Sequence, residues 1–487
     1  MNYISTRKLN KDAEGNTSAF VIKNGLAPDG GLYVPESLPA LNQATIESLI
    51  GMTYPERAAY ILSLFLTDYT KEELLNAAEA AYSKEKFGGP AAPIAKVGGD
   101  YFLELWHGPT SAFKDMALQI MPRLLSLSLG KTGESRDAYI LVATSGDTGK
   151  AALEGYCDID RVKIKVFYPV NGVSNIQKKQ MASQKGNNVD VVSINGNFDD
   201  AQSGVKAIFA NDCAKELLDK NGYFFSSANS INWGRLAPQI VYYVSAYCDL
   251  IAEGEIKYGE PLDVTVPTGN FGNIFAAFLA KKMGVPLGKL VCASNKNDIL
   301  TDFINKGVYD KRREFFTTTS PSMDILISSN LERLLWFAVG PESTKDCMEK
   351  LASEGIYSLS NEDMEKIRED FAGYACSEEK TKETISNLFK EFGYLCDTHT
   401  AVAAYAASEY KKGSGNKMLV VSTASPYKFA PAVLSSLGEE VPADDFDALD
   451  KLFAVTKTAI PANLANLRDA EVRFTKVIEP SEMINSL

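Results

Sequence analysis

Lys114 has sequence neighbours that favour a reactive amine. It stands in His107-Gly-Pro-Thr-Ser-Ala-Phe-Lys-Asp-Met116, where bulky apolar residues lie beside small polar ones. An ammonium group surrounded by apolar side chains loses hydration, so its pKa falls and its amine becomes a better nucleophile towards an aldehyde. Most lysines are instead solvated surface charges, and Lys114 is therefore a candidate only if a matching ligand site exists elsewhere in the chain.

The turn Gly269-Asn-Phe-Gly-Asn273 is a candidate site for a phosphate group. It joins a β-rich run, residues 262–266, to an apolar run, residues 274–279, that is typical of a helix. Its glycines allow close backbone approach, so successive N–H groups can point at an anion, and the start of the helix adds a positive dipole. An ordinary strand-to-helix turn is the alternative. The motif is neither a P-loop nor the G-x-G-x-x-G of dinucleotide enzymes.

A reactive lysine and a glycine-rich phosphate turn are together what pyridoxal phosphate requires. Thr423, in Val421-Ser-Thr-Ala-Ser-Pro426, then has a use, because a hydroxyl can hydrogen-bond the pyridine nitrogen without forcing its protonation. A helix N-cap is the other interpretation of Thr423. His399, in Asp397-Thr-His-Thr-Ala-Val402, is expected near the start of a helix, where a lone histidine is more often structural than catalytic.

A second turn, Thr144-Ser-Gly-Asp-Thr-Gly149, is a candidate site for an anionic substrate. The hydroxyls of Thr144, Ser145 and Thr148, together with the backbone amides, suit a carboxylate or a phosphate. Asp147 places a negative charge inside this turn. We expect Asp147 to serve as an N-cap or turn former, which is the commonest role of aspartate in such a place.

The loop Ser227-Ala-Asn-Ser-Ile-Asn-Trp-Gly-Arg235 collects amides, hydroxyls and an arginine. A guanidinium group can grip an oxyanion through two parallel hydrogen bonds. We therefore expect Arg235, with Asn232 and Ser145, to bind an anionic group of the substrate, and Lys150 is a further candidate. The alternative is a polar turn ahead of the helix expected from residue 238.

Three units of strand, turn and helix must position these residues. Their strands are expected at residues 138–143, 262–266 and 417–421. Such alternation predicts βαβ units around a parallel sheet, and hence an α/β fold. Ligands bind such sheets at the carboxyl ends of the strands, which is where the three turns lie.

The pattern along the chain predicts four regions. Thr70 and Glu73 predict a capping box ahead of an apolar helical stripe near the N-terminus. Met364, Ile367 and Phe371 are expected to share one helix face in a charged segment. We expect an N-terminal extension domain (1–95), an α/β core that carries the candidate site residues (96–300 and 396–440), a mainly helical insertion (301–395) and a C-terminal tail (441–487).

The composition excludes several classes of protein. The 487 residues carry a net charge of −12, with 45% apolar and 23% charged residues, which suits a folded chain but not a general nucleic-acid or anionic-membrane binder. No apolar run approaches the ~20 residues of a membrane span, and no signal peptide is expected. Seven scattered cysteines are typical of reduced thiols in a cytoplasmic protein, and with two histidines no metal site is expected.

These motifs resemble those of the threonine synthase family in its longer, N-terminally extended form. They occur in the family's order over nearly the whole chain: Pro28-Asp-Gly-Gly-Leu-Tyr-Val-Pro35, His107-Gly-Pro-Thr-Ser-Ala-Phe-Lys-Asp115, Thr144-Ser-Gly-Asp-Thr-Gly149, Asn229-Ser-Ile-Asn-Trp-Gly-Arg235, Gly269-Asn-Phe-Gly-Asn273 and Asp397-Thr-His-Thr-Ala-Val402. Asp147 departs from the Ser-Gly-Asn-Thr of related pyridoxal enzymes. The contact that this asparagine makes with the cofactor ring oxygen is therefore not carried over to Asp147.

The resemblance implies the fold-type-II architecture of the tryptophan-synthase β family, with the cofactor between two α/β lobes. It implies a lyase that converts O-phospho-L-homoserine and water to L-threonine and phosphate, the last step of threonine biosynthesis. Lys114 would form the Schiff base with pyridoxal 5'-phosphate, and Thr423 would face the pyridine nitrogen. The cofactor phosphate would be held by Gly269, Asn270, Phe271, Gly272 and Asn273. A cytoplasmic monomer or homodimer with no nucleic-acid or membrane partner is expected.

Other functions stay open at this stage. A threonine dehydratase or a cysteine-synthase-like enzyme needs no second phosphate site, so Ser145, Asn232 and Arg235 favour threonine synthase. A catalytically silent relative that only binds a small phosphorylated ligand is disfavoured by the retention of Lys114 and the full phosphate turn. A nucleotide-binding protein without the cofactor is least favoured, because no Walker or Rossmann motif is present.

Overall fold

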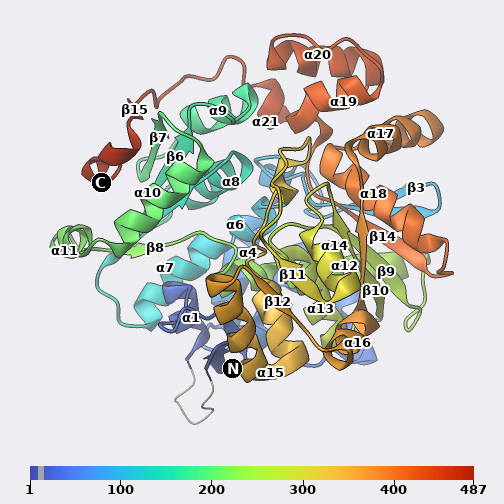
Figure 1. Ribbon diagram of the computed structural model, residues 1–487, viewed down its shortest axis with the longest axis horizontal. Helices are drawn as coiled ribbons and strands as arrows, with labels where there is room; N and C mark the ends of the chain where they lie inside the picture. Colours follow the sequence, from blue (N-terminus) through green and yellow to red (C-terminus); the bar gives the residue numbers. More distant parts are fainter. Residues whose placement is uncertain (9–15) are drawn as a thin grey trace.

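Two α/β lobes, each built around its own sheet, make up most of the molecule (Figure 1). The computed structural model describes residues 1–8 and 16–487. Among these residues, no helix combines the length and the apolar character that crossing a bilayer needs.

The larger sheet has six strands in the order β13-β10-β9-β14-β4-β3. All neighbours are parallel except β3, which pairs antiparallel with β4 at one edge. The strands are β3 (Ile94–Val97), β4 (Asp100–Glu104), β9 (Leu262–Pro267), β10 (Leu287–Ser294), β13 (Phe371–Ala375) and β14 (Lys417–Ser422).

Alternate residues of β14 pack on opposite faces of this sheet. Met418 and Val420 join the cluster that contains α18 (Thr398–Lys411), whereas Leu419 and Val421 join the main core with α13 (Gly272–Met283). Because side chains alternate along a strand, both faces of the strand must be apolar when helices cover both. The continuous apolar run of β14 has this cause.

The smaller sheet has five parallel strands in the order β15-β7-β6-β5-β8. They are β5 (Asp137–Ala143), β6 (Val162–Pro169), β7 (Val189–Ile194), β8 (Tyr223–Ser226) and β15 (Val477–Ile478). Its helices are α7 (Met121–Lys131), α8 (Asp147–Tyr156), α9 (Asn175–Ala182), α10 (Phe198–Ala210) and α11 (Asp212–Lys220). The predicted α/β class with parallel sheets is confirmed.

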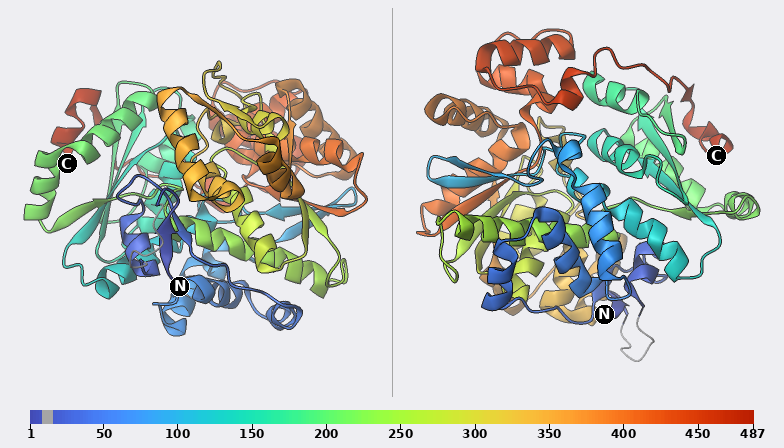
Figure 2. Two further views of the ribbon diagram at one scale, coloured as in Figure 1. Left: turned by 60° about the horizontal axis from the view of Figure 1, so that its bottom comes forward. Right: turned by 180° about the vertical axis from the view of Figure 1, so that it is seen from behind.

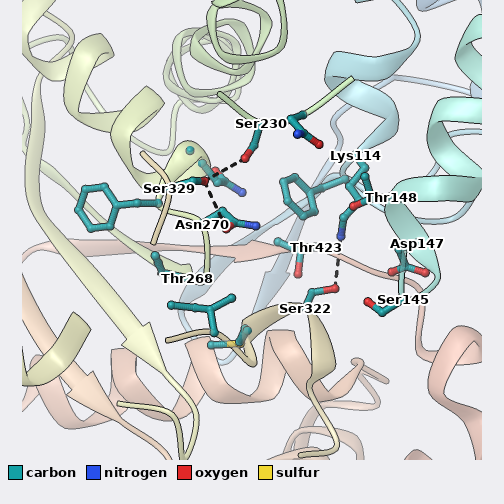
Figure 3. A pocket seen from close by; sticks show the side chains of 18 of the residues that line it. Lys114, Ser145, Asp147, Thr148, Ser230, Thr268, Asn270, Ser322, Ser329 and Thr423 are labelled. Carbon is teal, nitrogen blue, oxygen red and sulfur yellow. Dashed lines mark hydrogen bonds between the residues drawn. The ribbon is translucent and has the colours of Figure 1, made fainter. Parts of the chain in front are cut away.

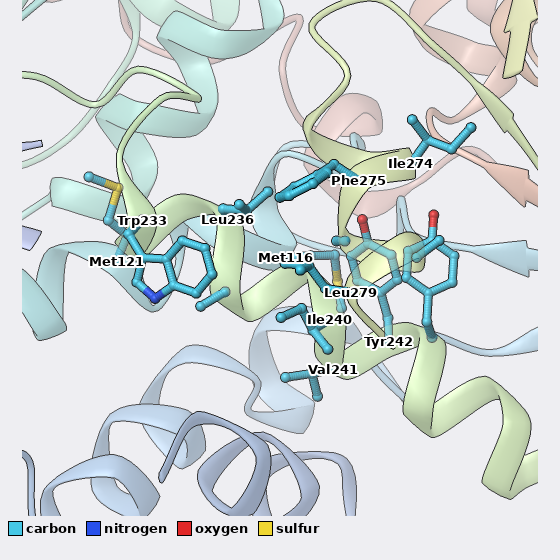
Figure 4. Close-up of a cluster of buried hydrophobic side chains, with 14 of the residues drawn as sticks. Met116, Met121, Trp233, Leu236, Ile240, Val241, Tyr242, Ile274, Phe275 and Leu279 are labelled. Atoms are coloured by element: carbon cyan, nitrogen blue, oxygen red, sulfur yellow. The ribbon is translucent and has the colours of Figure 1, made fainter. Parts of the chain in front are cut away.

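Helix α12 (Trp233–Ala252) lies inside the molecule, and Figure 4 shows several of its buried side chains among those of neighbouring elements. Nearly all of its residues are buried, including Trp233, Leu236 and Ile240, so it is covered around its whole circumference. A helix that is apolar on all sides needs such an environment. It contacts α13 on one side and the N-terminal helices on another, which joins these parts into one core.

The N-terminal region packs beneath both lobes (Figure 2). It contains β1 (Tyr3–Ser5), α1 (Ser18–Asn24), β2 (Tyr33–Pro35), α2 (Gln43–Ile50), α3 (Tyr54–Phe65), α4 (Lys71–Ala81) and α5 (Lys84–Phe87). The capping box predicted at Thr70 and Glu73 is confirmed at the start of α4.

The segment 301–395 contributes a strand to the larger sheet. Helix α16 (Asn361–Asp370) ends before Phe371, which begins β13 and pairs with β10. The expectation that Phe371 continues the helical face of Met364 and Ile367 is therefore wrong, because sheet pairing extends the backbone there. The segment also holds β11 (Val308–Asp310), η1 (Pro321–Met323), α15 (Leu331–Ser353), β12 (Ile356–Ser358) and α17 (Glu378–Phe392), and α14 (Ile299–Lys306) leads into it.

The C-terminal segment crosses from one lobe to the other. After η2 (Pro426–Phe429) and α19 (Ala430–Ser436) come α20 (Asp445–Thr456) and α21 (Ala462–Ala465). The chain then reaches β15, which pairs with β7. The final residues thus complete the smaller sheet. The four-part division of the chain stays a prediction.

Candidate active site

The predicted site residues converge on one cavity of about 340 Å³ between the two lobes. Its wall includes Lys114, Thr144, Ser145, Thr148, Arg235, Gly269, Asn270, Phe271, Gly272, Asn273 and Thr423. Figure 3 shows the side chains of several of them pointing towards a common space. These residues follow β4, β5, β9 and β14, so the cavity lies at the carboxyl ends of strands from both sheets, where parallel sheets bind ligands.

Lys114 lies between β4 and α6 (Asp115–Leu118), in a loop that is held against the end of β14. The backbone N–H of Phe113 donates to the Thr423 carbonyl at 2.8 Å, and the N–H of Ser425 donates to the Ser111 carbonyl at 3.1 Å. Ser111 adopts φ 58°, a left-handed conformation that is uncommon for a residue other than glycine. The loop therefore presents the lysine from a defined position.

The Lys114 amine is largely dehydrated. The residue is 8% exposed, and its Nζ donates to Ser322 Oγ at 3.3 Å. Burial lowers the pKa of Lys114 to about 8, and the positive charges of Arg235 and Lys428 act in the same direction, while Asp147 opposes them. The prediction that the surroundings of Lys114 dehydrate its amine is confirmed. An amine with this pKa can hold and release a proton near neutral pH.

The turn 269–273 presents an uncapped helix start to the cavity. Phe271 adopts φ 62°, and α13 begins at Gly272 without a side-chain cap. The first N–H groups of a helix lack intrahelical partners and carry the positive end of the helix dipole. They are suited to an anion.

The surroundings of Asn273 and Gly272 show whether a phosphate could fit beside this turn. Asn273 Oδ1 accepts hydrogen bonds from the hydroxyls of Tyr242, at 2.7 Å, and Tyr243, but its buried Nδ2 has no partner among the described residues. A Cβ placed on Gly272 would meet its nearest neighbour, Asn330 Nδ2, only at 3.4 Å, so space remains beside the backbone. An orphaned donor beside unfilled space is consistent with a bound phosphate.

Thr423 is free to face a ligand. It follows β14 directly, is buried and lines the cavity. The alternative role as N-cap is taken by Ser425, which caps η2 by accepting from the N–H of Tyr427 at 3.3 Å. The Thr423 hydroxyl is therefore available to a group in the cavity.

The turn 144–149 divides its hydroxyls between two tasks. Thr144 Oγ1 accepts from the N–H groups of Gly146 and Gly149 at 3.0 and 2.9 Å, so it holds the turn together. Ser145 is exposed and Thr148 is half-buried in the cavity wall. Those two hydroxyls are the better placed for a ligand.

Asp147 is not an N-cap, contrary to expectation. Gly146 occupies that position, and Asp147 is the first residue of α8. Its carboxylate faces the cavity, where Lys428 Nζ lies 2.6 Å from Oδ1 and Gln177 Nε2 donates at 2.8 Å. Although burial alone would raise the pKa of Asp147, Lys428 and Lys114 hold that pKa well below its usual range, so the group is an anion.

Arg235 lies in the cavity wall as predicted, but Asn232 does not. Asn232 is the N-cap of α12, where its Oδ1 accepts from the N–H of Gly234 and its Nδ2 donates to the Ile22 carbonyl, both at 2.8 Å. Lys150 is also turned away, bonded to Glu154 and Gln184. The expectation that Asn232 and Lys150 bind the substrate is therefore wrong, because capping and pairing within the protein occupy their polar atoms.

Several groups of the cavity carried no usable signal in the sequence. Ser322 comes from the irregular segment around η1, and Ser329 comes from a loop. Lys428 pairs with Asp147 of the cavity wall across a long sequence separation. Asn229, Ser230 and His399 did stand in motifs, although no ligand contact was assigned to them, and all three line the cavity.

Models of known protein families match the chain along its length. "Threonine synthase N terminus" matches residues 2–82, "Pyridoxal-phosphate dependent enzyme" matches residues 92–424, and "Threonine synthase, C-terminal" matches residues 400–486. The second of these covers every residue that lines the cavity.

Individual relatives agree with these models. The chain is 38% identical to threonine synthase of Pseudomonas aeruginosa, over 99% of this chain and 96% of the relative. It is 41% identical to human threonine synthase-like 1 over 89% of this chain, but it spans only 60% of the length of that relative.

Solved structures match as closely. The PLP-bound threonine synthase of Brucella melitensis has a TM-score of 0.88 at 36% identity, and the yeast enzyme has a TM-score of 0.90 at 31% identity. Each match covers all of this chain, with 98% and 97% of the known chain. The uncapped turn, the orphaned amide and the dehydrated lysine fit pyridoxal phosphate, the cofactor of the matched family model and of the Brucella structure. The chain belongs to the threonine synthase family of pyridoxal-phosphate-dependent enzymes.

Proposed function

We propose that the protein converts O-phospho-L-homoserine and water to L-threonine and inorganic phosphate. The observation that carries this proposal is Arg235, a buried cation in the same cavity as Lys114. Arg235 is 7% exposed, and its Nη1 donates to the Ala228 carbonyl at 2.7 Å. Among the described residues, no carboxylate forms an ion pair with it.

A buried arginine without a carboxylate partner is suited to an anionic ligand. Burial lowers the pKa of Arg235 to about 10, so the guanidinium still carries its charge at neutral pH. Its remaining N–H groups can form charge-assisted bonds to phosphate oxygens. With the turn 269–273 assigned to the cofactor, Arg235 supports a second phosphate, that of the substrate. Ser145 and Thr148 are further donors in this wall.

Lys114 is proposed as the group that holds the cofactor and then moves protons. Pyridoxal phosphate, when bound, supplies an electron sink for carbanions of the substrate. The turn 269–273 would hold its phosphate, and Thr423 would donate to its ring nitrogen. A Lys114 amine freed from the cofactor could take protons from the α and β carbons and deliver protons to the γ and α carbons, while phosphate leaves from the γ carbon and water adds at the β carbon. A well-placed base contributes ~10²–10⁴-fold to such a step.

The test is a product balance with the cofactor-loaded protein. We expect O-phospho-L-homoserine to yield phosphate and threonine in equal amounts, and homoserine to be inert, because hydroxide is a poor leaving group. Lys114→Ala should abolish both turnover and the visible absorbance of the lysine-bound cofactor. Deamination of threonine without any reaction of phosphohomoserine would establish a dehydratase instead, and binding of phosphohomoserine without turnover would establish a silent binding protein.

Arg235→Met separates the substrate site from the cofactor site. The variant should raise KM or lower kcat by about tenfold or more, since losing one partner of a desolvated charge pair costs about 2–5 kcal/mol. The visible spectrum should stay intact. Arg468→Met is the matched control, because Arg468 is an exposed surface residue paired with Asp447 and Asp450. Normal turnover by Arg235→Met would show that the substrate phosphate is held elsewhere.

We also propose a cytoplasmic location. All seven cysteines are free thiols, and five of them are buried. Free thiols persist in a reducing compartment.

A further inference from the structure

The segment around η1 forms the part of the cavity wall that contacts Lys114. Ser322, in the middle of η1, accepts a hydrogen bond from Lys114 Nζ through its hydroxyl (Figure 3). On its other side the segment touches the phosphate turn, since a Cβ on Gly269 would lie 2.6 Å from the Ser322 carbonyl oxygen. Ser322 therefore stands between the lysine and the turn 269–273.

A buried histidine holds Ser322 in this place. The backbone N–H of Ser322 donates to His399 Nε2 at 3.1 Å, and His399 Nδ1 lies 2.7 Å from Asp397 Oδ2. His399 is 2% exposed, and Asp397 is fully buried. Asp397 is itself fixed as the N-cap of α18, accepting from the N–H groups of His399 and Thr400 at 3.0 Å each.

The partners of His399 determine its protonation state. A backbone N–H can only donate, so Nε2 must present a lone pair, and the proton lies on Nδ1, facing Asp397. His399 is then a neutral ring with both nitrogens engaged. In this arrangement it does not serve as a general base for the substrate, because its only lone pair is taken by Ser322.

The rest of the segment is fixed independently of His399. Asn295 Nδ2 donates to Ser320 Oγ at 2.9 Å and to Asp324 Oδ1 at 2.8 Å, and Thr398 Oγ1 donates to the Thr319 carbonyl at 2.7 Å. The ends of the segment are therefore anchored. The contact with His399 sets the position of the one residue that reaches Lys114.

We propose that Ser322 is the hydrogen-bond partner of the free Lys114 amine and thus a catalytic residue, and that His399, oriented by Asp397, is a positioning residue that places Ser322. The motif Asp397-Thr-His-Thr thereby gains a role. No covalent bond forms or breaks in this contact. The serine oxygen accepts one hydrogen bond from the amine, and this orients the rest of the amine group towards the cavity. The role of this amine in turnover rests on the proposed function, whereas the hydrogen bond between Lys114 and Ser322 does not.

The contact can be measured in the apoprotein, without turnover. Pyridoxal phosphate is mixed with apoprotein over a range of pH, and the rate at which the visible absorbance appears reports the neutral fraction of Lys114. Because an acceptor stabilises the charged amine more than the neutral one, Ser322→Ala should move the midpoint of this rate to lower pH by about half a unit or more. Ser322→Thr keeps the hydroxyl and should restore the wild-type midpoint.

His399 variants test the positioning role. His399→Leu should shift the midpoint as Ser322→Ala does, and His399→Gln, whose amide oxygen can accept, should shift it less. The double variant of Ser322→Ala with His399→Leu should shift no further than Ser322→Ala alone, because the histidine acts through the serine. Ser408→Ala, at the exposed far end of α18, is the control and should match the wild type. Circular dichroism checks that each variant folds, and if His399→Leu does not, His399→Gln completes the cycle.

Two results would overturn this inference. An unshifted midpoint in Ser322→Ala would show that the hydroxyl does not act on Lys114. Additive shifts in the double variant would show that His399 does not act through Ser322. A wild-type protein that fails to convert phosphohomoserine but shows the expected shifts would contradict the proposed function alone.

Discussion

Burial lowers the pKa of both cations of the cavity but suits them to different tasks. It lowers the pKa of Lys114 to about 8 and that of Arg235 to about 10. The cause is the same, since a low dielectric disfavours a charged group, but the starting values differ. At neutral pH, Lys114 can therefore exchange its proton, while Arg235 remains a cation. This difference suits one group to chemistry and the other to binding an anion.

The first prediction concerns the pH dependence of cofactor loading. Below pH 8 most Lys114 amines are protonated and unreactive, so the rate of loading should rise about tenfold for each pH unit up to about 8 and level off above it. The measurement is the growth of visible absorbance after apoprotein is mixed with pyridoxal phosphate. Lys114→Arg should show no coloured adduct at any pH. A rate that keeps rising beyond pH 10 would contradict a dehydrated lysine.

The second prediction concerns Gly272. A side chain there would fill the space beside the first N–H groups of α13 and keep a phosphate away. Gly272→Val should raise the Kd for pyridoxal phosphate about tenfold or more, while the free energy of unfolding of the apoprotein changes by less than about 1 kcal/mol. Equilibrium dialysis and urea denaturation give the two values. Gly130→Val, where a Cβ meets nothing within 4 Å, serves as control, and equal affinities would place the anion elsewhere.

At the scale of elements, the lysine depends on the close packing of α6 against α8. A Cβ on Gly155, near the end of α8, would overlap the carbonyl oxygen of Leu118, the last residue of α6. The two helix backbones are thus in direct contact. Since α6 follows Lys114 immediately, this contact helps to set where the loop that carries Lys114 ends.

The third prediction tests that contact. Gly155→Ala should lower the free energy of unfolding by about 1–3 kcal/mol, because the backbone of α6 must move to admit a methyl group. Gly130→Ala should instead raise it by up to about 1 kcal/mol, because that methyl group meets no neighbour and alanine favours a helix. Urea denaturation of the apoproteins compares them. Equal stabilities would show that α6 and α8 can separate without loss.

At the scale of the molecule, the cavity draws its walls from both lobes. The turn 144–149 belongs to the smaller sheet, and the turn 269–273 and Thr423 belong to the larger one. The C-terminal segment also joins the lobes, through β15. A ligand held by both walls binds the folded chain and not the unfolded one.

The fourth prediction follows from this linkage. Pyridoxal phosphate at about 100 times its Kd should raise the free energy of unfolding by about 2.7 kcal/mol, and the midpoint of thermal unfolding should rise with cofactor concentration. Lys114→Ala and Gly272→Val should each show a smaller rise at the same concentration. A midpoint independent of cofactor in the wild-type protein would mean that the cofactor does not bind the folded state preferentially.

Much of the fold could be predicted because its signals are local. Strand-turn-helix units, the capping box at Thr70 and the α/β class depend on residues close together in the chain, and the structure confirms them. The prediction for Phe371 failed because pairing with β10 overrode a helical pattern. The predictions for Asn232 and Lys150 failed because their polar atoms are satisfied within the protein. Each has a local partner, Gly234 and Glu154 respectively, and a more distant one, the Ile22 carbonyl and Gln184.

By itself, the sequence determined which residue types could do chemistry: a lysine among apolar neighbours, two glycine-containing turns and an arginine in a polar loop. Tertiary structure alone decided which of them share a cavity, and it added Ser322 and Lys428 from segments without a recognisable signal. The physical reason is distance along the chain. Lys428 and Asp147 form one buried pair although they lie 281 positions apart in the sequence. No local pattern records a contact that forms only when the two lobes pack against each other.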